Sequence, residues 1–481
     1  MKIRKTRSRK QPGYVMDLEF AKDTICAIAT PVGEAGIGLI RLSGPEALEA
    51  VLRIFRPGEP ARPLASHTLR HGWIADPFSN ELVDEVLVSF MAAPRTYTRE
   101  DVVEINCHSG FAVLHRILDL LLSGGARLAR PGEFTRRAFL NGRIDLSQAE
   151  AVIEMIRTRS DQGLSLANRH LRGDLRLLVE AWLETLERVQ AHLEALIDFC
   201  EDIAEGPSPY ESIRKSLSLE VADPLRTVLK NFDEGRLLRE GLTFVLVGKP
   251  NVGKSSLLNA LLGKNRAIVT PSPGTTRDVI EDTFLLGGVQ VRLLDTAGIR
   301  GEPDEIESHG IEMTIRSLSE ADVALWLLDR SRPLSGEDDR VYEAIGKKRC
   351  VVLLNKSDLP AAFPAETVAS RFPGLGPAMT LSVKNPSDLE GLKERLAEEF
   401  IKRPVQTCGS QIVPNLRQKE HLQRAADALH KAADLLGSDD SYGELISFEI
   451  QCARSELESV IGRSHDIDLL DRIFLQFCVG K

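Results

Sequence analysis

The eight residues 248–255, GKPNVGKS, constrain the fold of this chain more than any other stretch. They follow the apolar run 244–247 and precede 256–262, whose apolar residues have helical spacing. A strand, a glycine-rich loop and a helix in this order form a P-loop, whose backbone N–H groups surround a phosphate chain. The helix N-terminus adds positive potential at the same place. The sequence therefore predicts a nucleotide-binding α/β domain in which Lys254 reaches the outer phosphates and the Ser255 hydroxyl binds Mg²⁺.

Three further segments follow in the order that a guanine-nucleotide switch requires. The motif DTAG, 295–298, ends an apolar run and supplies a carboxylate for Mg²⁺ and a glycine N–H for the γ-phosphate. The loop GTTRD, 274–278, offers a threonine to Mg²⁺ and can become ordered on a triphosphate. The motif NKSD, 355–358, ends another apolar run, and its carboxylate accepts the N1–H and N2–H of guanine, a pair of donors that adenine lacks. Each segment alone resembles a surface turn, but together they predict binding of GTP rather than ATP.

Ile299 follows DTAG directly, where many small GTPases place a glutamine that orients the attacking water. An apolar side chain cannot orient water, so another group must do so; the nearby candidates are Arg300, Glu302, Asp304, Glu305 and Glu307. No arginine finger is evident either. Asn251, with carbonyl groups from 270–275, could hold a monovalent cation between the phosphates, although ordinary loop chemistry explains this asparagine equally well.

Composition sets the outer limits. A chain of 481 residues is long enough for two to four domains, each with its own core. The net charge of −9 excludes a global basic field for nucleic acid, whereas the basic leader 1–20, with six Lys or Arg in its first ten residues, is predicted to be a disordered tail or a loose RNA contact. Seven cysteines without a CxxC pair, no secretory signal and no run of about 18 apolar residues predict a cytoplasmic chain without a membrane span.

Residues 21–140 have the short strands and turns of an α+β domain. Four strands and one helix are predicted, at 25–30, 37–42, 83–90, 102–107 and 111–122. The segment 130–143 at the end of this domain is dense in charge around turn residues, and its composition favours a solvated loop.

Helical periodicity begins after residue 140 and returns near the C-terminal end. Apolar residues recur every three or four positions in four stretches, at 175–196, 210–238, 422–436 and 446–460. The segments 141–238 and 403–481 are therefore predicted to form one helical domain, interrupted by an inserted nucleotide domain at 239–402. Close to the end, Cys478 is either a buried thiol in a last helical turn or part of a site.

Three motifs together resemble the MnmE (TrmE) family of tRNA-modifying GTPases. They are DLSQAEA at 145–151 directly after NGRI, GTTRD at 274–278, and FCVGK at 477–481. The similarity covers nearly the whole chain from about residue 22, and the tail is its most specific part. It implies an N-terminal folate-binding α+β domain that forms a homodimer, a helical domain built from two chain segments, and an inserted Ras-like α/β P-loop GTPase domain.

The resemblance also implies an activity. Members of the family act with the flavoprotein MnmG, in a heterotetramer or larger assembly, on C5 of the wobble uridine of certain tRNAs. They add an aminomethyl or carboxymethylaminomethyl group and take a one-carbon unit from a folate such as 5-formyltetrahydrofolate. Their two G domains pair across the nucleotide faces when GTP and K⁺ are present, and that pairing accelerates hydrolysis of GTP to GDP and phosphate.

The family's catalytic and metal positions carry over residue by residue. The catalytic positions fall on Glu307, which orients water indirectly, and on Arg300 in a switch. Mg²⁺ falls on Ser255 and Thr276. The K⁺ ligands fall on Asn251, Thr270, Ser272 and Thr275.

The ligand contacts carry over in the same way. The folate contacts fall on Arg41, Glu104, Arg143 and Lys481, with Cys478 beside them as a possible modification-site thiol. The GTP contacts fall on Asn251, Val252, Gly253, Lys254, Ser255, Ser256, Thr270, Pro271, Ser272, Pro273, Gly274, Thr275, Thr276, Asp295, Thr296, Ala297, Gly298, Asn355, Lys356, Asp358, Ser382, Val383 and Lys384. Two positions depart from the family. Arg143 stands where some members carry Lys, and Val383 replaces the usual Ala of the loop that contacts the base.

Two other classes of function stay open at this point. One is a ribosome-assembly GTPase without modification chemistry, a class that usually adds an RNA-binding KH module or a second G domain; neither a basic Gly-x-x-Gly loop after the G domain nor a second P-loop is present. The other is a scaffold for a modifying enzyme, in which hydrolysis acts only as a timer. The sequence does not separate this scaffold from true participation in catalysis.

Overall fold

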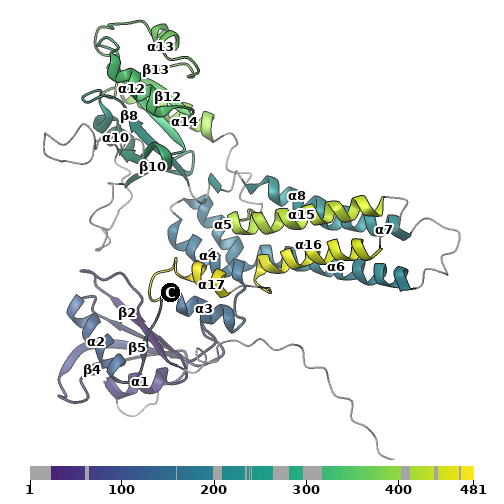
Figure 1. Ribbon diagram of the computed structural model, residues 1–481. Helices are drawn as coiled ribbons and strands as arrows, with labels where there is room; N and C mark the ends of the chain where they lie inside the picture. Colours follow the sequence, from purple (N-terminus) through teal and green to yellow (C-terminus); the bar gives the residue numbers. More distant parts are fainter. Residues whose placement is uncertain are drawn as a thin grey trace, which may run out of the picture. The chain divides into compact units, whose positions relative to one another are not determined.

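The described part of the chain divides into two compact units. Figure 1 labels the helices and strands that form them. The computed structural model describes residues 23–59, 64–158, 160–198, 209–232, 236–237, 239, 241–263, 281–295, 317–401, 412–437, 443–464 and 467–481. One unit contains the described residues up to Ala149 together with those from 467 onward, and the other contains those from Glu150 to Ser464. The last described segment, 467–481, therefore belongs to the same unit as the N-terminal residues.

A seven-stranded sheet in the order β3-β4-β5-β6-β2-β1-β7 forms the first unit. Neighbouring strands are antiparallel except β1 and β7, which are parallel. The strands are β1 (Ile25–Ile28), β2 (Gly38–Ser43), β3 (Phe55–Pro57), β4 (Thr68–Ala75), β5 (Leu82–Met91), β6 (Val102–Cys107) and β7 (Arg127–Leu128). The four strands predicted from alternating apolar residues are confirmed, whereas β3, β4 and β7 were not predicted.

The main apolar core of the first unit lies on one face of this sheet, and a smaller cluster of Ile25, Ala27, Ala129 and Phe134 lies on the other face at β1. Helices α1 (Ala47–Ile54) and α2 (Phe111–Ser123) bury their apolar sides against strand residues such as Ile40, Leu42 and Ile105. Because side chains alternate along a strand, the residues between these point to the opposite face. Arg41 on β2 and Glu104 on β6 therefore lie on the face away from α1 and α2.

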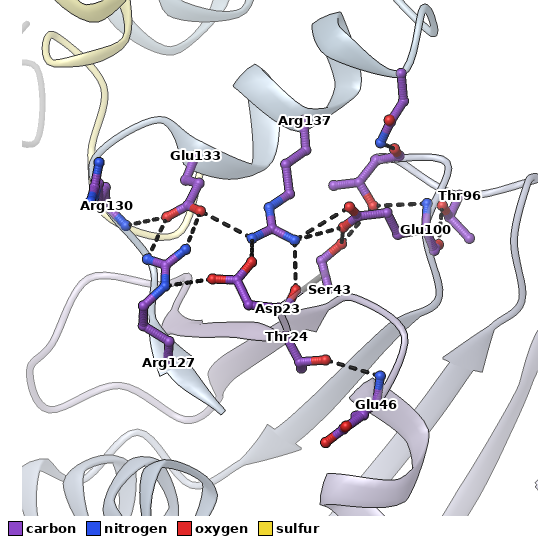
Figure 2. A network of polar contacts seen from close by, with 12 residues as sticks. Asp23, Thr24, Ser43, Glu46, Thr96, Glu100, Arg127, Arg130, Glu133 and Arg137 are labelled. Carbon is purple, nitrogen blue, oxygen red and sulfur yellow. Dashed lines mark hydrogen bonds and ion pairs between the residues drawn. The ribbon is translucent and has the colours of Figure 1, made fainter. Parts of the chain in front are cut away.

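The charge-rich segment 130–143 is not a solvated loop, and that prediction was wrong. Most of it forms the helix α3 (Glu133–Leu140), in which Glu133 and Arg137 are each only 4% exposed. Their charges are matched inside the unit by Asp23, Glu100 and Arg127, as Figure 2 shows. Composition alone could not reveal these partners, since Asp23 lies 114 residues before Arg137 in the sequence.

The helical part of the second unit combines segments from both sides of the nucleotide domain. The helices are α4 (Leu146–Arg157), which starts in the first unit, α5 (Asp161–Arg172), α6 (Asp174–Asp198), α7 (Pro209–Ser216), α8 (Asp223–Lys230), α15 (Leu416–Leu436) and α16 (Gly443–Ile461). Residues of α6, α7, α8, α15 and α16 share one apolar core, which confirms the predicted bundle of two chain segments. The predicted stretch 210–238 is divided, because a π-helical turn, Leu217–Ala222, separates α7 from α8.

The inserted domain has a six-stranded sheet in the order β13-β12-β11-β8-β10-β9. All pairs are parallel except β9 with β10. The strands are β8 (Leu242–Val247), β9 (Glu281–Leu286), β10 (Val289–Asp295), β11 (Val323–Asp329), β12 (Cys350–Asn355) and β13 (Met379–Thr380).

Helices cover both faces of this second sheet. One face packs against α10 (Lys254–Leu262) and α14 (Pro386–Phe400), and the other against α12 (Gly336–Ile345) and α13 (Glu366–Arg371). In such a doubly wound sheet, ligands bind at the carboxyl ends of the parallel strands. That edge carries the residues that follow β8 and the ends of β10, β11 and β12. Across the described ranges, no helix is long and apolar enough to cross a membrane.

Candidate functional sites

The P-loop lies at the carboxyl end of β8 and leads into α10. Gly248 and Gly253 have φ of +147° and +107°, and a Cβ at either position would collide with Leu327 or Asn355, so only glycine fits. Between them, Asn251 also adopts a left-handed conformation, with φ of 61°. The Lys254 ammonium donates hydrogen bonds to the carbonyl oxygens of Gly248 (2.8 Å) and Lys249 (2.9 Å), which closes the loop. At the start of α10, Ser255 and Ser256 are exposed.

Asn355 joins the P-loop to the predicted base-contact loop. Its side-chain amide nitrogen donates to the carbonyl of Val252 at 2.7 Å, and its amide oxygen accepts from the backbone N–H of Val383 at 3.2 Å. The residue is 3% exposed, so both bonds are shielded from water. One side chain thus fixes three predicted nucleotide segments relative to one another.

The carboxylate of Asp358 is held beside the 382–384 loop. Ser382 Oγ donates to Asp358 Oδ1 at 2.9 Å, and Lys384 Nζ lies 3.2 Å from Asp358 Oδ2. These two donors hold the pKa of Asp358 below its usual value. The group is therefore ionised at neutral pH and can accept two N–H donors from one edge of a base.

Other predicted nucleotide residues lie outside the described residues. They are Thr270, Pro271, Ser272, Pro273, Gly274, Thr275, Thr276, Thr296, Ala297, Gly298, Arg300 and Glu307. Asp295 is the last residue of β10, and its backbone is paired with Leu246 of the neighbouring β8. It thus stands at the same edge of the sheet as the P-loop.

A second group of predicted residues meets in the first unit. Arg41 and Glu104 are opposite each other on β2 and β6, and Arg41 Nε donates to Glu104 Oε1 at 2.8 Å. Arg41 Nη1 also donates to the carbonyl of Gly480, at 3.4 Å. Glu104 and Gly480, which lie 63 and 439 positions after Arg41 in the sequence, therefore contact the same guanidinium group.

The C-terminal tail reaches this guanidinium by close backbone packing. The backbone N–H groups of Gly132 and Phe134, at the start of α3, donate to the carbonyl oxygens of Cys478 (3.4 Å) and Lys481 (3.2 Å). Gly480, with φ of +97°, passes so close to Ile28 that a side chain would not fit. The tail is therefore held in one conformation by contacts that depend little on side chains.

Lys481 lies close enough to Arg41, Glu104 and Cys478 for these groups to act on its ammonium. Burial lowers the pKa of the Lys481 ammonium and the Arg41 charge lowers it further, whereas Cys478 and Glu104 oppose that change. The Cys478 thiol is exposed and lies after the last helix, α17 (Ile467–Phe474). A buried thiol in a last helical turn is therefore the wrong alternative for this cysteine.

Aromatic rings complete the surroundings of Arg41. Its guanidinium carbon lies 5.9 Å from the ring centroid of Tyr97 and 5.8 Å from that of Phe134, and that of Arg143 lies 4.8 Å from the Tyr97 ring. These are cation–π distances. The Tyr97 hydroxyl is 2.9 Å from Thr135 Oγ1, which ties the ring to α3. Tyr97 thus connects the two predicted folate-binding arginines.

The ion network beneath α3 fixes the segments that carry this site (Figure 2). Arg137 Nη2 lies 2.6 Å from Asp23 Oδ1 and 3.1 Å from Glu133 Oε1, and its Nη1 lies 3.2 Å from Glu100. Burial raises the pKa of Glu133, but hydrogen bonds from Arg127, the Arg130 backbone and Arg137 outweigh burial and leave this pKa lowered. The network joins α3, which holds the tail, to the loop that carries Tyr97.

Comparison with known proteins shows to which family the chain belongs. The family described as GTP-binding protein TrmE N-terminus matches residues 24–143, and the MnmE helical domain matches residues 146–478. The chain is 56% identical over 471 residues to the tRNA modification GTPase MnmE of Syntrophobacter fumaroxidans, which covers 97% of this chain and 100% of the relative. It is 44% identical to the MnmE of Carboxydothermus hydrogenoformans, over 96% of this chain and 100% of the relative. The chain belongs to the MnmE family of tRNA modification GTPases.

Among solved structures, this MnmE-family chain is similar to Aquifex aeolicus Era bound to GDP.AlF4-. The identity is 28%, the coverage is 39% of this chain and 66% of that one, and the TM-score is 0.26. Family membership makes the inserted domain a GTP-binding domain and the chain a GTP hydrolase.

Sequence reasoning missed several residues of the two sites in this MnmE-family chain. Tyr97 follows no motif that was used, although an aromatic residue in a loop directly before a predicted strand is a usable signal. Asp329 ends the apolar run of β11 and pairs with Lys356 at 2.6 Å; a carboxylate at the end of a buried strand could have been found as Asp295 was. Glu133 lies four residues before Arg137, a spacing typical of a helical ion pair, whereas the distant partners Asp23 and Glu100 had no local signal.

Proposed function

We propose that this chain is a K⁺-dependent GTPase that works as a homodimer with the flavoprotein MnmG to modify C5 of the wobble uridine of certain tRNAs. The group added is aminomethyl or carboxymethylaminomethyl, and its one-carbon unit comes from a folate such as 5-formyltetrahydrofolate. The single observation that carries the folate part is the meeting of Arg41, Glu104 and Lys481 in one place.

The chemistry of these side chains suits a folate. The pterin ring presents two neighbouring N–H donors on one edge, and a carboxylate such as that of Glu104 accepts such a pair. The glutamate tail of a folate is anionic, and Arg143 and Lys481 offer positive charge to it. Tyr97 is a further residue of this site, since it orients Arg41 and Arg143 through its ring. Cys478 is exposed beside them and is the candidate thiol.

Exposed apolar side chains on β4 and β5 of the first sheet support the homodimer. Leu69 on β4 is paired with Ser89 on β5, and Ser89 with Glu104 on β6, so these side chains share the face that carries Arg41. Leu69 is 55% exposed, and Leu87, two residues from Ser89 on the same face, is 40% exposed. Exposed apolar side chains on a face away from the helices favour a second copy of this domain as the partner. The predicted folate site would then lie next to the dimer contact.

The metal positions of the proposal suit the described P-loop. The Ser255 hydroxyl at the first turn of α10 is exposed and would hold Mg²⁺ together with Thr276. The exposed Asn251 would hold K⁺ with carbonyl groups of 270–275, and a cation there supplies positive charge between the β- and γ-phosphates. Glu307 and Arg300 are the proposed catalytic positions. MnmG and tRNA are the proposed partners.

Mass analysis of tRNA tests the whole proposal. Cells that lack this chain should lose the C5-modified wobble uridines, and expression of the unchanged chain should restore them. The variant Glu104→Gln should restore GTP hydrolysis without restoring the modification. Normal wobble uridines in cells without the chain would refute the function, whereas full rescue by Glu104→Gln would refute only the folate site.

A further inference from the structure

The second residue of the P-loop is bound to the start of a helix that carries no nucleotide motif. Lys249 Nζ lies 2.7 Å from Asp338 Oδ2 and 3.0 Å from Ser335 Oγ. Ser335 is the N-cap of α12, and Asp338 is the third residue of that helix. The ion pair therefore joins residues 249 and 338, which are 89 positions apart in the sequence.

Asp338 is placed there at an energetic cost. It is 1% exposed, and its Oδ2 accepts both the Lys249 ammonium and the backbone N–H of Ser335, at 2.8 Å. Within the described ranges, its other oxygen, Oδ1, is buried without a hydrogen-bond partner. A capping box needs only a side-chain acceptor, which an uncharged residue also supplies. The charge of Asp338 suits both the N-terminus of α12 and the ammonium of Lys249.

The same lysine is part of the closed P-loop. The carbonyl oxygen of Lys249 accepts a hydrogen bond from the Lys254 ammonium, whose predicted task is to reach the outer phosphates. Fixing the Lys249 side chain at α12 limits the movement of its backbone, and that backbone orients Lys254. A second ion pair, between Lys356 and Asp329, holds the start of the loop that connects β11 to α12. This loop is therefore attached at one end to the NKSD motif and at the other end to the P-loop.

We propose that Asp338 is a positioning residue for GTP binding and hydrolysis, and that it acts through Lys249. The pair holds the P-loop in the conformation that receives the phosphates before nucleotide arrives. Neither side chain needs to touch the nucleotide. This role rests on the GTPase activity that family membership gives the chain. It is independent of the folate, the K⁺ and the MnmG parts of the proposed function.

Three variants of the full-length chain separate this role from simple stabilisation of α12. Lys249→Met keeps the length of the side chain and removes the charge, and Lys249→Arg keeps the charge. Asp338→Asn keeps an oxygen for the Ser335 N–H and removes the charge. The matched control is Arg371→Met, which breaks a more exposed ion pair of the same helix, Arg371 with Asp339 at 2.7 Å.

The measurements are the dissociation constants of fluorescent GDP and GTP analogues, the turnover rate and the melting temperature. Lys249→Met and Asp338→Asn should each weaken nucleotide binding by about 10-fold, the low end for residues that support a binding shell. Lys249→Arg and Arg371→Met should stay within about two-fold of the unchanged chain. The double variant Lys249→Met with Asp338→Asn should bind no more weakly than either single variant, because both remove one interaction.

The outcomes decide the proposal. Unchanged nucleotide binding in Lys249→Met, even with a lower melting temperature, would show a purely structural pair and overturn it. Equal loss in Arg371→Met would show that any damage to α12 has this effect, and would overturn it as well. Additive losses in the double variant would mean that Asp338 does not act through Lys249.

Discussion

Arg41 and Glu104 face each other across neighbouring antiparallel strands, with Arg41 Nε 2.8 Å from Glu104 Oε1, and the carbonyl oxygen of Gly480 lies 3.4 Å from the same guanidinium. One side chain thus links the middle of the first sheet to the C-terminal tail. The pair is part-buried, with 17% and 24% of the side chains exposed. It is therefore both a structural contact of the tail and the core of the proposed folate site.

Replacing Arg41 by Lys should weaken folate binding. Lysine keeps the charge but lacks the planar group that contacts Glu104, Gly480 and the two aromatic rings. We expect the dissociation constant for 5-formyltetrahydrofolate to rise by about 10-fold or more, measured by calorimetry. GTP turnover should not change. The control is Arg53→Lys, which alters an exposed ion pair on α1; an equal loss in the control would contradict the assignment.

Removing the charge of Arg137 should destabilise the first unit. The variant Arg137→Met leaves the buried carboxylate of Glu133 with one arginine fewer and deprives Asp23 and Glu100 of a partner. Breaking a buried ion pair from one side costs about 3 kcal/mol of unfolding free energy. Chemical denaturation followed by circular dichroism measures it. The exposed pair of Arg53 and Glu49 provides the comparison, since Arg53→Met should cost less than about 1 kcal/mol; similar losses in both variants would contradict a special role for the network.

Acidic pH should remove the contribution of the same ion network to the stability of the first unit. Burial raises the pKa values of Glu133 and Asp23, but their arginine partners outweigh burial, so both lie below the ordinary values of 4.5 and 3.8. A carboxyl group whose pKa is lower in the folded state than in the unfolded state stabilises the fold at pH values above its unfolded-state pKa. This stabilisation is lost as the pH falls through its folded-state pKa. The difference in melting temperature between the unchanged chain and Arg137→Met should therefore be full at pH 6 and shrink below pH 4.5. A difference that stays constant down to pH 3 would argue against this linkage.

The nucleotide site could be predicted from sequence because its signals are local. The P-loop, DTAG and NKSD each end an apolar strand, and the parallel order of β8, β10, β11 and β12 brings those ends to one edge. The bundle could be predicted for a similar reason, since helical periodicity needs only neighbouring residues.

The network and the tail site required pairings that no local pattern shows. From the sequence alone, Arg137 is expected to be a solvated charge, because its ion pairs with Asp23 and Glu100 depend on the fold. Strand β4 was missed because its alternation is broken by Gly72 and polar residues, and its place in the sheet depends on pairing with β5. Arg41 and Glu104 were named through resemblance alone, and the register of β2 with β6 supplies their physical connection.

Hydrolysis should depend on K⁺ and on Glu307. Ile299 cannot orient water, so turnover in the full-length chain should fall when Na⁺ replaces K⁺, and Asn251→Ala should remove the response to K⁺. Glu307→Ala should retain nucleotide binding and lower turnover by roughly 10²–10³, the scale of one lost catalytic interaction. A steady-state phosphate-release assay in matched KCl and NaCl buffers measures both effects. Equal rates in the two salts would refute the cation site, and unchanged turnover in Glu307→Ala would remove this residue from the catalytic positions.

Asp358 should decide which base is bound. Its carboxylate is ionised and held by Ser382 and Lys384, so we expect it to accept the N1–H and N2–H of guanine. In Asp358→Asn an N–H₂ donor replaces one acceptor, and it faces the guanine amino group, donor against donor. We expect the dissociation constant for GTP to rise by about 100-fold, which corresponds to the loss of roughly 3 kcal/mol for bonds to a charged group. Xanthosine triphosphate carries a carbonyl in place of that amino group and should bind the variant better than it binds the unchanged chain. Competition against a fluorescent GDP analogue measures both nucleotides. If the variant keeps its preference for GTP over xanthosine triphosphate, the carboxylate of Asp358 does not read the base, and the Asn355 bridge to Val252 and Val383 must set specificity through loop shape alone.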